Sequence, residues 1–154
     1  MKITELKINQ NILTDDKVGR IFNQFKELLN ELEKKNLTDD IIESINQEID
    51  ELNAIPHTNN DLKKIIKQKQ SKIIKLIVTE MKIVPKNYYR NLWLAIGMSL
   101  FGAPLGLLFT LVLKNKGLFA IGIPTGMVIG IALGSGMDKK AFEEGRQLDM
   151  EIKY

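Results

Sequence analysis

The side chains best suited to acid–base or metal chemistry are the single histidine and two pairs of adjacent aspartates, which are His57, Asp15–Asp16 and Asp39–Asp40. Each aspartate pair follows a threonine and opens a stretch with helical apolar spacing. There the threonine is a good N-cap and the carboxylates oppose the positive end of the helix dipole. His57 lies between a proline and a threonine, without the serine, carboxylate or metal-ligand partners that catalysis requires. Because cysteine is also absent, the sequence predicts no enzyme and no catalytic, cofactor-binding or metal-binding residue.

Glycines spaced for close helix packing form a second pattern. Gly122, Gly126, Gly130 and Gly134 recur every four residues, and each step turns about 40° past one helical revolution, so they form a gently winding stripe. Missing side chains let another backbone approach closely, which holds helices together in lipid. The preceding apolar stretch offers two matching rows of small residues, Ala95–Ser99–Ala103 and Gly102–Gly106–Thr110. This glycine zipper either closes a hairpin within the chain or also faces other copies in an oligomer.

Prolines interrupt both glycine-containing stretches within the pattern Gly-x-Pro-x-Gly, at Pro104 and Pro124. Each proline removes one backbone hydrogen bond, so we expect a kink at each position and a freed carbonyl. The hydroxyls of Thr110 and Thr125 are available as replacement donors. Interrupted helices at matching depth also occur in transporters, but here no ionisable side chain lies at that depth. Packing kinks are the favoured interpretation.

The stretches that carry these glycines are long enough to cross a membrane. Residues 92–113 and 117–137 comprise 22 and 21 residues without a charge. At about 1.5 Å per residue, each covers roughly 30 Å, the thickness of a hydrocarbon core. Only Lys114, Asn115 and Lys116 separate them, which predicts an antiparallel two-helix transmembrane hairpin. The alternative, a hairpin buried in a soluble bundle, would need many covering helices, and only residues 1–91 precede it.

Basic and aromatic residues flank the two predicted spans unevenly. Eight basic residues stand near the outer ends, against two in the turn between the spans. The positive-inside rule therefore predicts a multi-pass protein of the cell (inner) membrane with both termini in the cytoplasm. The residues expected at the lipid interface are Lys82, Lys86, Tyr88, Tyr89, Arg90, Trp93, Lys139 and Lys140.

Three features stand out in the last part of the chain: the sequence Lys-Ile-Val-Pro-Lys-Asn-Tyr-Tyr-Arg-Asn-Leu-Trp at 82–93, the glycine stripe, and Gly-Met-Asp-Lys-Lys-Ala at 136–141. Together they resemble an uncharacterised family of small bacterial two-span glycine-zipper membrane proteins. The resemblance covers about the last seventy residues. Since that family has no assigned activity, the resemblance implies a membrane location and no particular chemistry.

The N-terminal half has the helical periodicity of a small polar domain. Apolar residues recur at helical spacing over about 15–35, 39–55 and 59–84. After the spans, Ala141, Gly145, Leu148 and Ile152 also share one helical face. The predicted fold class is all-α, a cytosolic helical bundle or coiled-coil-like hairpin followed by a two-helix transmembrane hairpin. The predicted domains are a cytosolic module over 1–85, the transmembrane hairpin over 86–137 and a cytosolic helical tail over 138–154.

Charge divides sharply along the N-terminal half. Residues 1–59 hold 7 basic and 12 acidic side chains, a net charge of −5, whereas residues 60–91 hold 9 and 2, a net charge of +7. The acidic helices either neutralise the basic helix within the bundle, or the basic helix attracts anionic lipid at about 1 kcal/mol for each residue near the surface. We favour the first interpretation before Lys75 and the second for Lys82, Lys86 and Arg90.

These patterns favour a membrane-anchored scaffold or interaction subunit; the alternative is a homo-oligomeric channel or membrane-perturbing glycine-zipper protein. The expected partners are the lipid bilayer, including anionic lipid, and a second copy or another membrane protein. No small-molecule substrate is predicted. Nucleic acid is not expected either, because the net charge is only +3 and no basic motif interleaved with aromatic residues is present.

Overall fold

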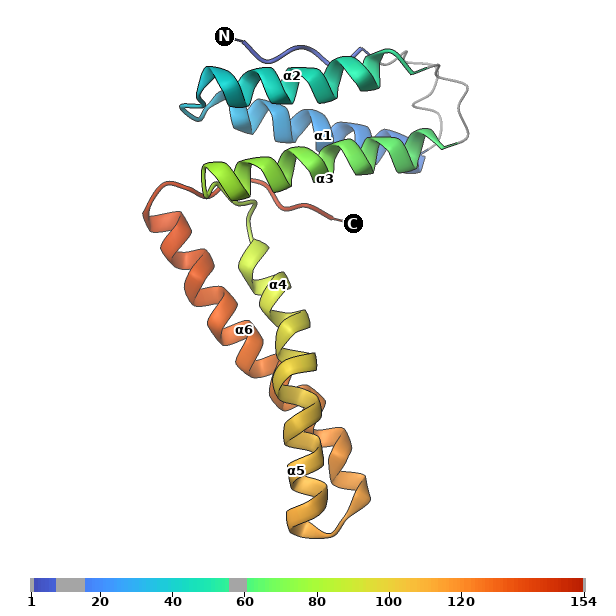
Figure 1. Cartoon of the computed structure of the whole chain (residues 1–154), viewed down its shortest axis with the longest axis vertical. Coiled ribbons are helices and arrows are strands. Elements are labelled where there is room, and N and C mark those ends of the chain that lie inside the picture. The colour runs from blue at the N-terminus through green and yellow to red at the C-terminus, as the bar shows by residue number, and fades with distance from the viewer. Residues whose placement is uncertain (1, 8–15, 56–60, 154) are drawn as a thin grey trace. The chain divides into compact units, whose positions relative to one another are not determined.

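The computed structural model describes residues 2–7, 16–55 and 61–153, and in this part of the chain the secondary structure is helical without strands, as the all-α prediction expects. Figure 1 shows the helices in chain order. They are α1 (Asp16–Glu33), α2 (Asp39–Asn53), α3 (Leu62–Glu80), α4 (Tyr88–Ile96), the π-helical segment η2 (Gly97–Gly102), α5 (Ala103–Leu113), the short 3₁₀ helix η3 (Lys116–Leu118) and α6 (Phe119–Glu143). Two compact units result. We call Met1–Val84 with Leu148–Tyr154 the polar module, and Pro85–Gln147 the hairpin.

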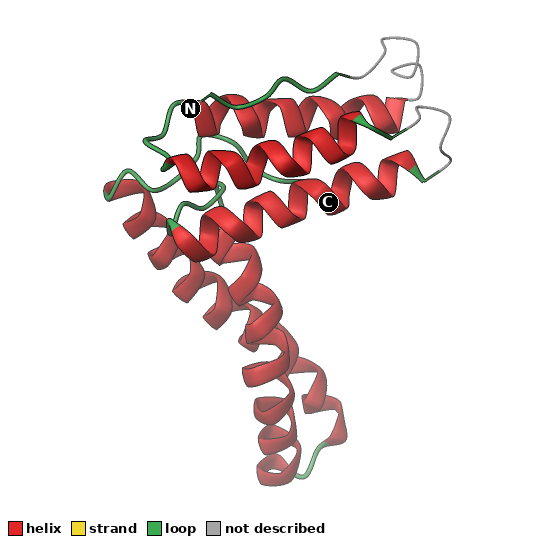
Figure 2. Cartoon of the chain, turned by 45° about the horizontal axis from the view of Figure 1, so that its top comes forward, coloured by secondary structure: helices red, strands yellow, loops and turns green. Residues whose placement is uncertain are grey.

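The polar module is built on the apolar faces of α1, α2 and α3, with α3 packed against both of the others (Figure 2). The helical period of the sequence accounts for this core. Every residue expected on the apolar face of α2 is buried: Ile41, Ile42, Ile45, Ile49 and Leu52. Large side chains from α1 and α3, among them Phe25, Leu28, Ile66 and Ile77, are also fully buried. The large apolar side chains of these three helices are therefore buried within the module itself.

The helix starts agree only in part with the expected caps. Thr38 is the N-cap of α2 and has an extended backbone, and Asp39 and Asp40 lie in the first turn, but the Thr38 side chain makes no capping hydrogen bond. The favourable placement of carboxylates against the helix dipole is therefore present without the hydroxyl cap. Asp15 and His57 lie outside the described residues.

The end of the chain differs from the predicted helical tail over 138–154. Helix α6 continues to Glu143 and then stops at Gly145, whose φ is +68°. The Arg146 amide donates to the Ala141 carbonyl at 2.9 Å and the Gly145 amide donates to the Phe142 carbonyl at 3.0 Å, the pairing that ends a helix at a left-handed glycine. The described residues beyond it, 146–153, are not helical.

Two non-helical segments, one at each end of the chain, complete the polar module. In the C-terminal segment Leu148, Met150 and Ile152 are buried and alternate with more exposed charged residues. Its backbone amides at Asp149 and Lys153 donate to the side chains of Glu31 and Gln24 of α1. An alternating pattern, with a period of two residues, is that of an extended chain, and this explains why the helical interpretation of Leu148 and Ile152 failed.

The hairpin consists of one continuous helix, formed by α4, η2 and α5, which packs against α6 along its length. The turn between them follows local backbone chemistry. Lys114 ends α5 in the left-handed conformation, with φ 51°, and the Asn115 side chain then accepts a hydrogen bond from the Gly117 amide at 3.0 Å. This side-chain turn reverses the chain within a few residues.

Candidate functional site: a glycine-lined apolar hairpin

The hairpin is apolar on its outside. Among the described residues, every large hydrophobic side chain that is exposed belongs to it: Leu92, Met98, Leu100, Leu107, Leu108, Leu111, Val112, Leu113, Phe119, Ile121, Ile123, Val128, Ile131, Leu133, Met137 and Phe142. The helices Tyr88–Leu113 and Phe119–Glu143 are long and apolar enough to cross a membrane, and their most apolar stretches are only 17% and 22% buried within the protein. Water is a poor solvent for such a surface.

Small residues, in contrast, face inward. Gly122, Gly126, Gly130 and Gly134 of α6 are all buried. A Cβ atom added to Gly126 would lie 2.3 Å from the Gly97 carbonyl oxygen, and one added to Gly130 would lie 2.1 Å from the Trp93 carbonyl oxygen. Both distances are far below van der Waals contact, so backbone meets backbone along the whole stripe. The four glycines therefore pack on the first helix of their own chain.

The opposing face of the first helix is only partly the one expected. Gly102 and Gly106 are buried against Gly122, but Ala95, Ser99 and Ala103 are exposed and point away from α6. The third inward residue is Gly97, which spacing alone did not reveal. In a regular α-helix a step of five residues turns about 140° past a full revolution, which would place Gly97 and Gly102 on different faces.

The π-helical segment Gly97–Gly102 removes this conflict. Its wider turn holds more residues, so Gly97 comes back into line with Gly102 and then with Gly106. The cause lies two residues further on, because Pro104 has no amide hydrogen to donate to the Leu100 carbonyl and its ring crowds that carbonyl. In the sequence, two glycines five residues apart and followed closely by a proline thus indicate this π-helical segment.

The two prolines have different surroundings. Pro104 lies at the start of α5, directly after the π-helical segment, whereas Pro124 lies inside α6, which continues through it. The expected hydroxyl donors do not serve the freed carbonyls. Thr110 donates to the Gly106 carbonyl at 2.9 Å and Thr125 donates to the Ile121 carbonyl at 2.8 Å, each four residues back. Each hydroxyl is thus satisfied within its own helix.

Asp138 of α6 links the two helices at the end of the hairpin away from the turn, which we call the open end. This residue was not singled out from the sequence. It is 7% exposed, and its two carboxylate oxygens accept the backbone amides of Tyr89, at 3.0 Å, and Arg90, at 2.8 Å. These amides belong to the first turn of α4, where backbone donors lack helical partners and a negative charge is favourable. A carboxylate from α6 thus caps α4 across the hairpin, a long-range contact that local patterns do not reveal.

Basic and aromatic residues surround this open end. Lys86, Lys139 and Lys140 are exposed, and Arg90 and Trp93 are partly exposed. The rings of Tyr88 and Tyr89 meet edge to face, with centroids 5.3 Å apart. Of the residues expected at a lipid interface, only Lys82 lies in the polar module, where its ammonium group donates to the Thr79 carbonyl at 2.8 Å.

Acidic neighbours moderate the positive charge at the open end. Lys139 and Lys140 stand 3.9 Å from Glu143 and Glu144, exposed pairs that contribute little to stability. Arg146 is hydrogen-bonded to Glu144, which raises the pKa of its guanidinium above the ordinary value. Five basic residues at this end, Lys86, Arg90, Lys139, Lys140 and Arg146, outnumber the three acidic ones, Asp138, Glu143 and Glu144, so a net positive charge remains.

In the polar module, α2 neutralises part of the basic helix α3. Lys69 is buried and donates to Glu48 at 2.7 Å and also to Glu51, and Lys72 lies 3.1 Å from Glu48. Burial alone would raise the pKa of Glu48, but hydrogen bonds from Lys69 and Lys72 outweigh it and hold that pKa below its usual value. Burial acts to lower the pKa of Lys69, but hydrogen bonds to Glu48 and Glu51 outweigh burial and raise that pKa above its ordinary value. For these two lysines, pairing within the module is the interpretation that holds.

Comparison with known proteins gives no relative: no protein family, curated protein or solved structure matches this chain. The family resemblance stays a prediction. Function is therefore inferred from the geometry of the hairpin and the module.

Proposed function

We propose that this chain is an integral membrane protein whose hairpin crosses the bilayer and whose polar module works on the cytoplasmic side as an anchored scaffold or interaction subunit. One observation carries the proposal. The exposed large hydrophobic side chains of the described residues all lie on the hairpin, whereas those of the module are gathered in its own core. Helices that are apolar all round are stable when lipid surrounds them.

The glycine stripe supports the same arrangement. Helices in lipid gain nothing from hiding apolar surface, and they associate through close backbone packing instead. Here the inward glycines supply that packing while leucine, isoleucine, valine and phenylalanine face out. Such a distribution is the reverse of a water-soluble helix pair, in which the large apolar side chains meet at the centre.

The orientation follows from the basic residues at the two ends. Lys86, Arg90, Lys139 and Lys140 flank the open end, and Lys114 and Lys116 lie in the turn. Further lysines precede the first span in the sequence, so the positive-inside rule favours a cytoplasmic open end and a turn on the far side. Anionic lipid headgroups would then contact Lys86, Arg90 and Trp93.

The glycine stripe also bears on the alternative, a homo-oligomeric channel. A channel of this kind needs a packing surface for other copies and a polar path, yet the stripe packs on its own chain and residues 92–137 hold only the two turn lysines as charges. An anchored interaction subunit is therefore the better-supported role. Vesicle leakage that depends on Gly126→Leu or Gly130→Leu would reverse this preference.

Two measurements test the proposal. After alkaline carbonate washing of membranes the full chain should stay in the pellet and be released by detergent, whereas recovery in the supernatant would refute membrane insertion. From gentle detergent, the intact protein should then co-purify with a constant partner in fixed ratio. Repeated recovery of the chain alone would refute the scaffold role and leave the anchor intact.

A further inference from the structure

One pocket of the polar module is lined by positive charge alone, and we call it the basic pocket. It is open to solvent, has a volume of about 480 Å³, and lies between the first halves of α1 and α3, beside the C-terminal segment. Five basic residues line it together with one glutamine and one isoleucine; the basic ones are Lys17, Arg20, Lys63, Lys67 and Lys153. None of the lining residues that the structure describes is acidic.

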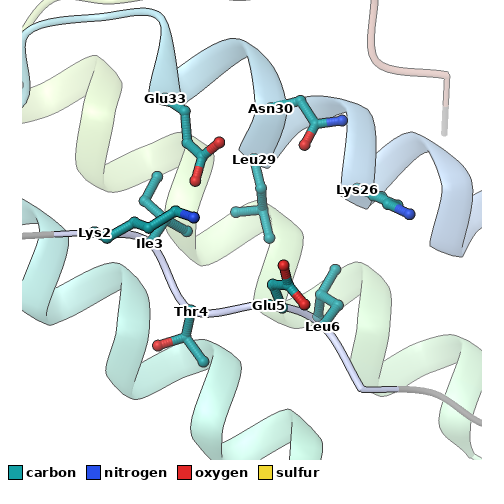
Figure 3. Close-up of a pocket in the computed structure, with 9 residues that line it drawn as sticks. All are labelled: Lys2, Ile3, Thr4, Glu5, Leu6, Lys26, Leu29, Asn30 and Glu33. Atoms are coloured by element: carbon teal, nitrogen blue, oxygen red, sulfur yellow. The ribbon is translucent and has the colours of Figure 1, made fainter.

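Three other pockets of the module are balanced in charge. The pocket beside Lys2–Lys7, with a volume of about 200 Å³, has two basic and two acidic residues in its lining, Lys2, Lys26, Glu5 and Glu33 (Figure 3). The other two have the same balance, with Lys72, Lys75, Glu48 and Glu80 in one and Lys2, Lys35, Glu33 and Asp39 in the other. The single sign of the basic pocket is therefore not a general property of the module's surface.

Helix geometry gathers four of the five cations. Lys63 and Lys67 are four residues apart and so lie on one side of α3. Lys17 and Arg20 are three residues apart and lie on one side of α1 in the same way. The α3 lysines that pair with glutamates of α2 lie on another side of their helix, so α2 does not neutralise this stripe.

Gln24 connects the three elements that carry the cations. Its side-chain oxygen accepts the backbone amide of Lys153 at 3.0 Å, which holds the C-terminal segment beside α1. Its side-chain nitrogen donates to the side-chain oxygen of the buried Gln70 at 3.4 Å, which links α1 to α3. The walls of the basic pocket are therefore held together by hydrogen bonds through one side chain.

This arrangement is unfavourable in the absence of an anion. Both α1 and α3 begin at this end of the module, so the positive ends of two helix dipoles lie beside the cations (Figure 1). Basic residues near a helix start, and like charges near one another, both reduce stability. Lys17 and Arg20 each have a further interaction of their own. Lys63, Lys67 and Lys153 form no ion pair within the described part of the chain, so a bound anion would relieve both effects.

We infer that the basic pocket binds a small anion with two or more phosphate groups, either a soluble molecule or the headgroup of a phosphorylated lipid. One phosphate group carries a charge of about −1.5 to −2 at neutral pH, so at least two are needed to approach the charge of five cations. Lysine and arginine each offer several donors to phosphate oxygens. No aromatic side chain is among the described lining residues, so a strand of nucleic acid with stacked bases is not favoured.

Isothermal titration calorimetry of the full chain in nonionic detergent tests the site, with inorganic tripolyphosphate as the probe. Binding should be saturable, with one tripolyphosphate for each chain. Sulfate at the same ionic strength should bind at least about tenfold more weakly, because it carries too little charge to engage all the cations. An oligo-aspartate peptide should also bind at least about tenfold more weakly, since its charges are spread along a chain. Absence of saturable tripolyphosphate binding, or equal affinity for sulfate or the peptide, would overturn the inference.

A matched pair of variants separates this pocket from general attraction to a basic helix. Lys63→Gln with Lys67→Gln removes two charges from the pocket and should weaken tripolyphosphate binding at least about tenfold. Lys64→Gln with Lys75→Gln removes the same charge from exposed positions of α3 outside the pocket, and should leave the affinity within about twofold. Equal weakening by the two pairs would contradict a defined site.

Chemical acetylation of lysines in the unaltered chain gives a readout that needs no variant. With N-hydroxysuccinimidyl acetate and peptide mass spectrometry, tripolyphosphate should protect Lys63, Lys67 and Lys153 from modification. Lys64 and Lys75 are the internal controls and should react at an unchanged rate, because they do not line the basic pocket. Protection of none of these lysines, or equal protection of all five, would overturn the inference.

Lipid nanodiscs decide where the phosphate comes from. Tripolyphosphate binding is measured in discs of phosphatidylcholine that contain either phosphatidylinositol bisphosphate or enough phosphatidylserine to give the same surface charge. A headgroup that occupies the pocket predicts at least about tenfold weaker binding in the first discs, whereas a soluble ligand predicts equal affinity in both. Failure to bind in plain phosphatidylcholine discs overturns the site itself. Because the basic pocket lies entirely within the polar module, phosphate binding and the membrane anchor can fail separately.

Discussion

Replacing Gly126 with alanine should loosen the hairpin, whereas the same replacement at Gly136 should leave it intact or slightly more stable. Both glycines lie in α6, and they differ in what an added methyl group would meet. At Gly126 the new carbon would stand 2.3 Å from the Gly97 carbonyl oxygen and 2.5 Å from the Gly102 amide nitrogen. At Gly136 nothing lies within 4 Å.

The size of the effect follows from these distances. Ordinary contact begins at about 3.4 Å, so Gly126→Ala requires the two helices to separate by about 1 Å. Overpacking of this kind costs about 1–3 kcal/mol, and alanine returns up to about 1 kcal/mol through its better helix propensity. Gly136→Ala gains the same helix propensity, and its added methyl group meets no other atom. Because the propensity gain is common to both variants, they should differ by the overpacking cost alone, about 1–3 kcal/mol in free energy of unfolding.

The assay is unfolding of the full chain in mild micelles by increasing fractions of sodium dodecyl sulfate. Trp93 is the only tryptophan and its carbonyl faces Gly130, so its fluorescence reports on the separation of the two helices. Far-ultraviolet circular dichroism separates loss of packing from loss of helix. Equal stability of the two variants would show that the backbones do not meet at Gly126, and would refute the packing described for the stripe.

Two further perturbations address single side chains. Asp138→Ala should destabilise the open end of the hairpin by about 0.5–2 kcal/mol, because it removes the cap on the Tyr89 and Arg90 amides. The same micelle titration checks this against the exposed control Glu143→Ala, and an effect no larger than the control's would contradict the capping role. Lys69→Met should lower the free energy of unfolding of the polar module by about 1–3 kcal/mol at neutral pH, because it leaves the half-buried Glu48 with fewer partners. The control Lys75→Met, at an exposed position of α3, should leave it unchanged. Because the pKa of Glu48 is lowered from 4.5, the contribution of this cluster is present above that value and is lost as the pH falls through the lowered pKa. Hydrogen exchange of α2 amides should therefore show the difference between wild type and Lys69→Met shrinking below about pH 4.5; a constant difference down to pH 2 would contradict it.

The helices of the polar module could be predicted because their apolar period is regular and local. All five residues expected on the buried face of α2 are buried, and α1 ends within two residues of the predicted position. Amphipathic spacing reports directly on which face meets the core. The two apolar helices were also visible, because length and lack of charge depend only on composition.

Features that depend on non-local contacts or on a change of period were missed. Gly97 joins the inward face only because the helix widens before Pro104, and a constant 3.6-residue period cannot show that. Asp138 meets α4 across 48 residues of chain. In the segment Leu148–Lys153 buried residues alternate with a period of two, but the four-residue spacing of Leu148 and Ile152 fits a helical face as well, so the helical prediction was wrong there. Asn46 and Asn53 of α2 bind the backbone of Lys2–Lys7 through their side chains, a contact across more than 40 residues of chain that no local pattern predicts.

The most direct test of the central proposal is the accessibility of single cysteines in intact cells. The natural chain has no cysteine, so Asn115→Cys in the turn, Lys139→Cys at the open end and Glu43→Cys in the module each give one reactive thiol. A membrane-impermeant maleimide should label Asn115→Cys in intact cells, and should label the other two only after the membrane is permeabilised. Equal labelling of all three in intact cells, or labelling of Lys139→Cys alone, would contradict a hairpin that crosses the bilayer with its module in the cytoplasm.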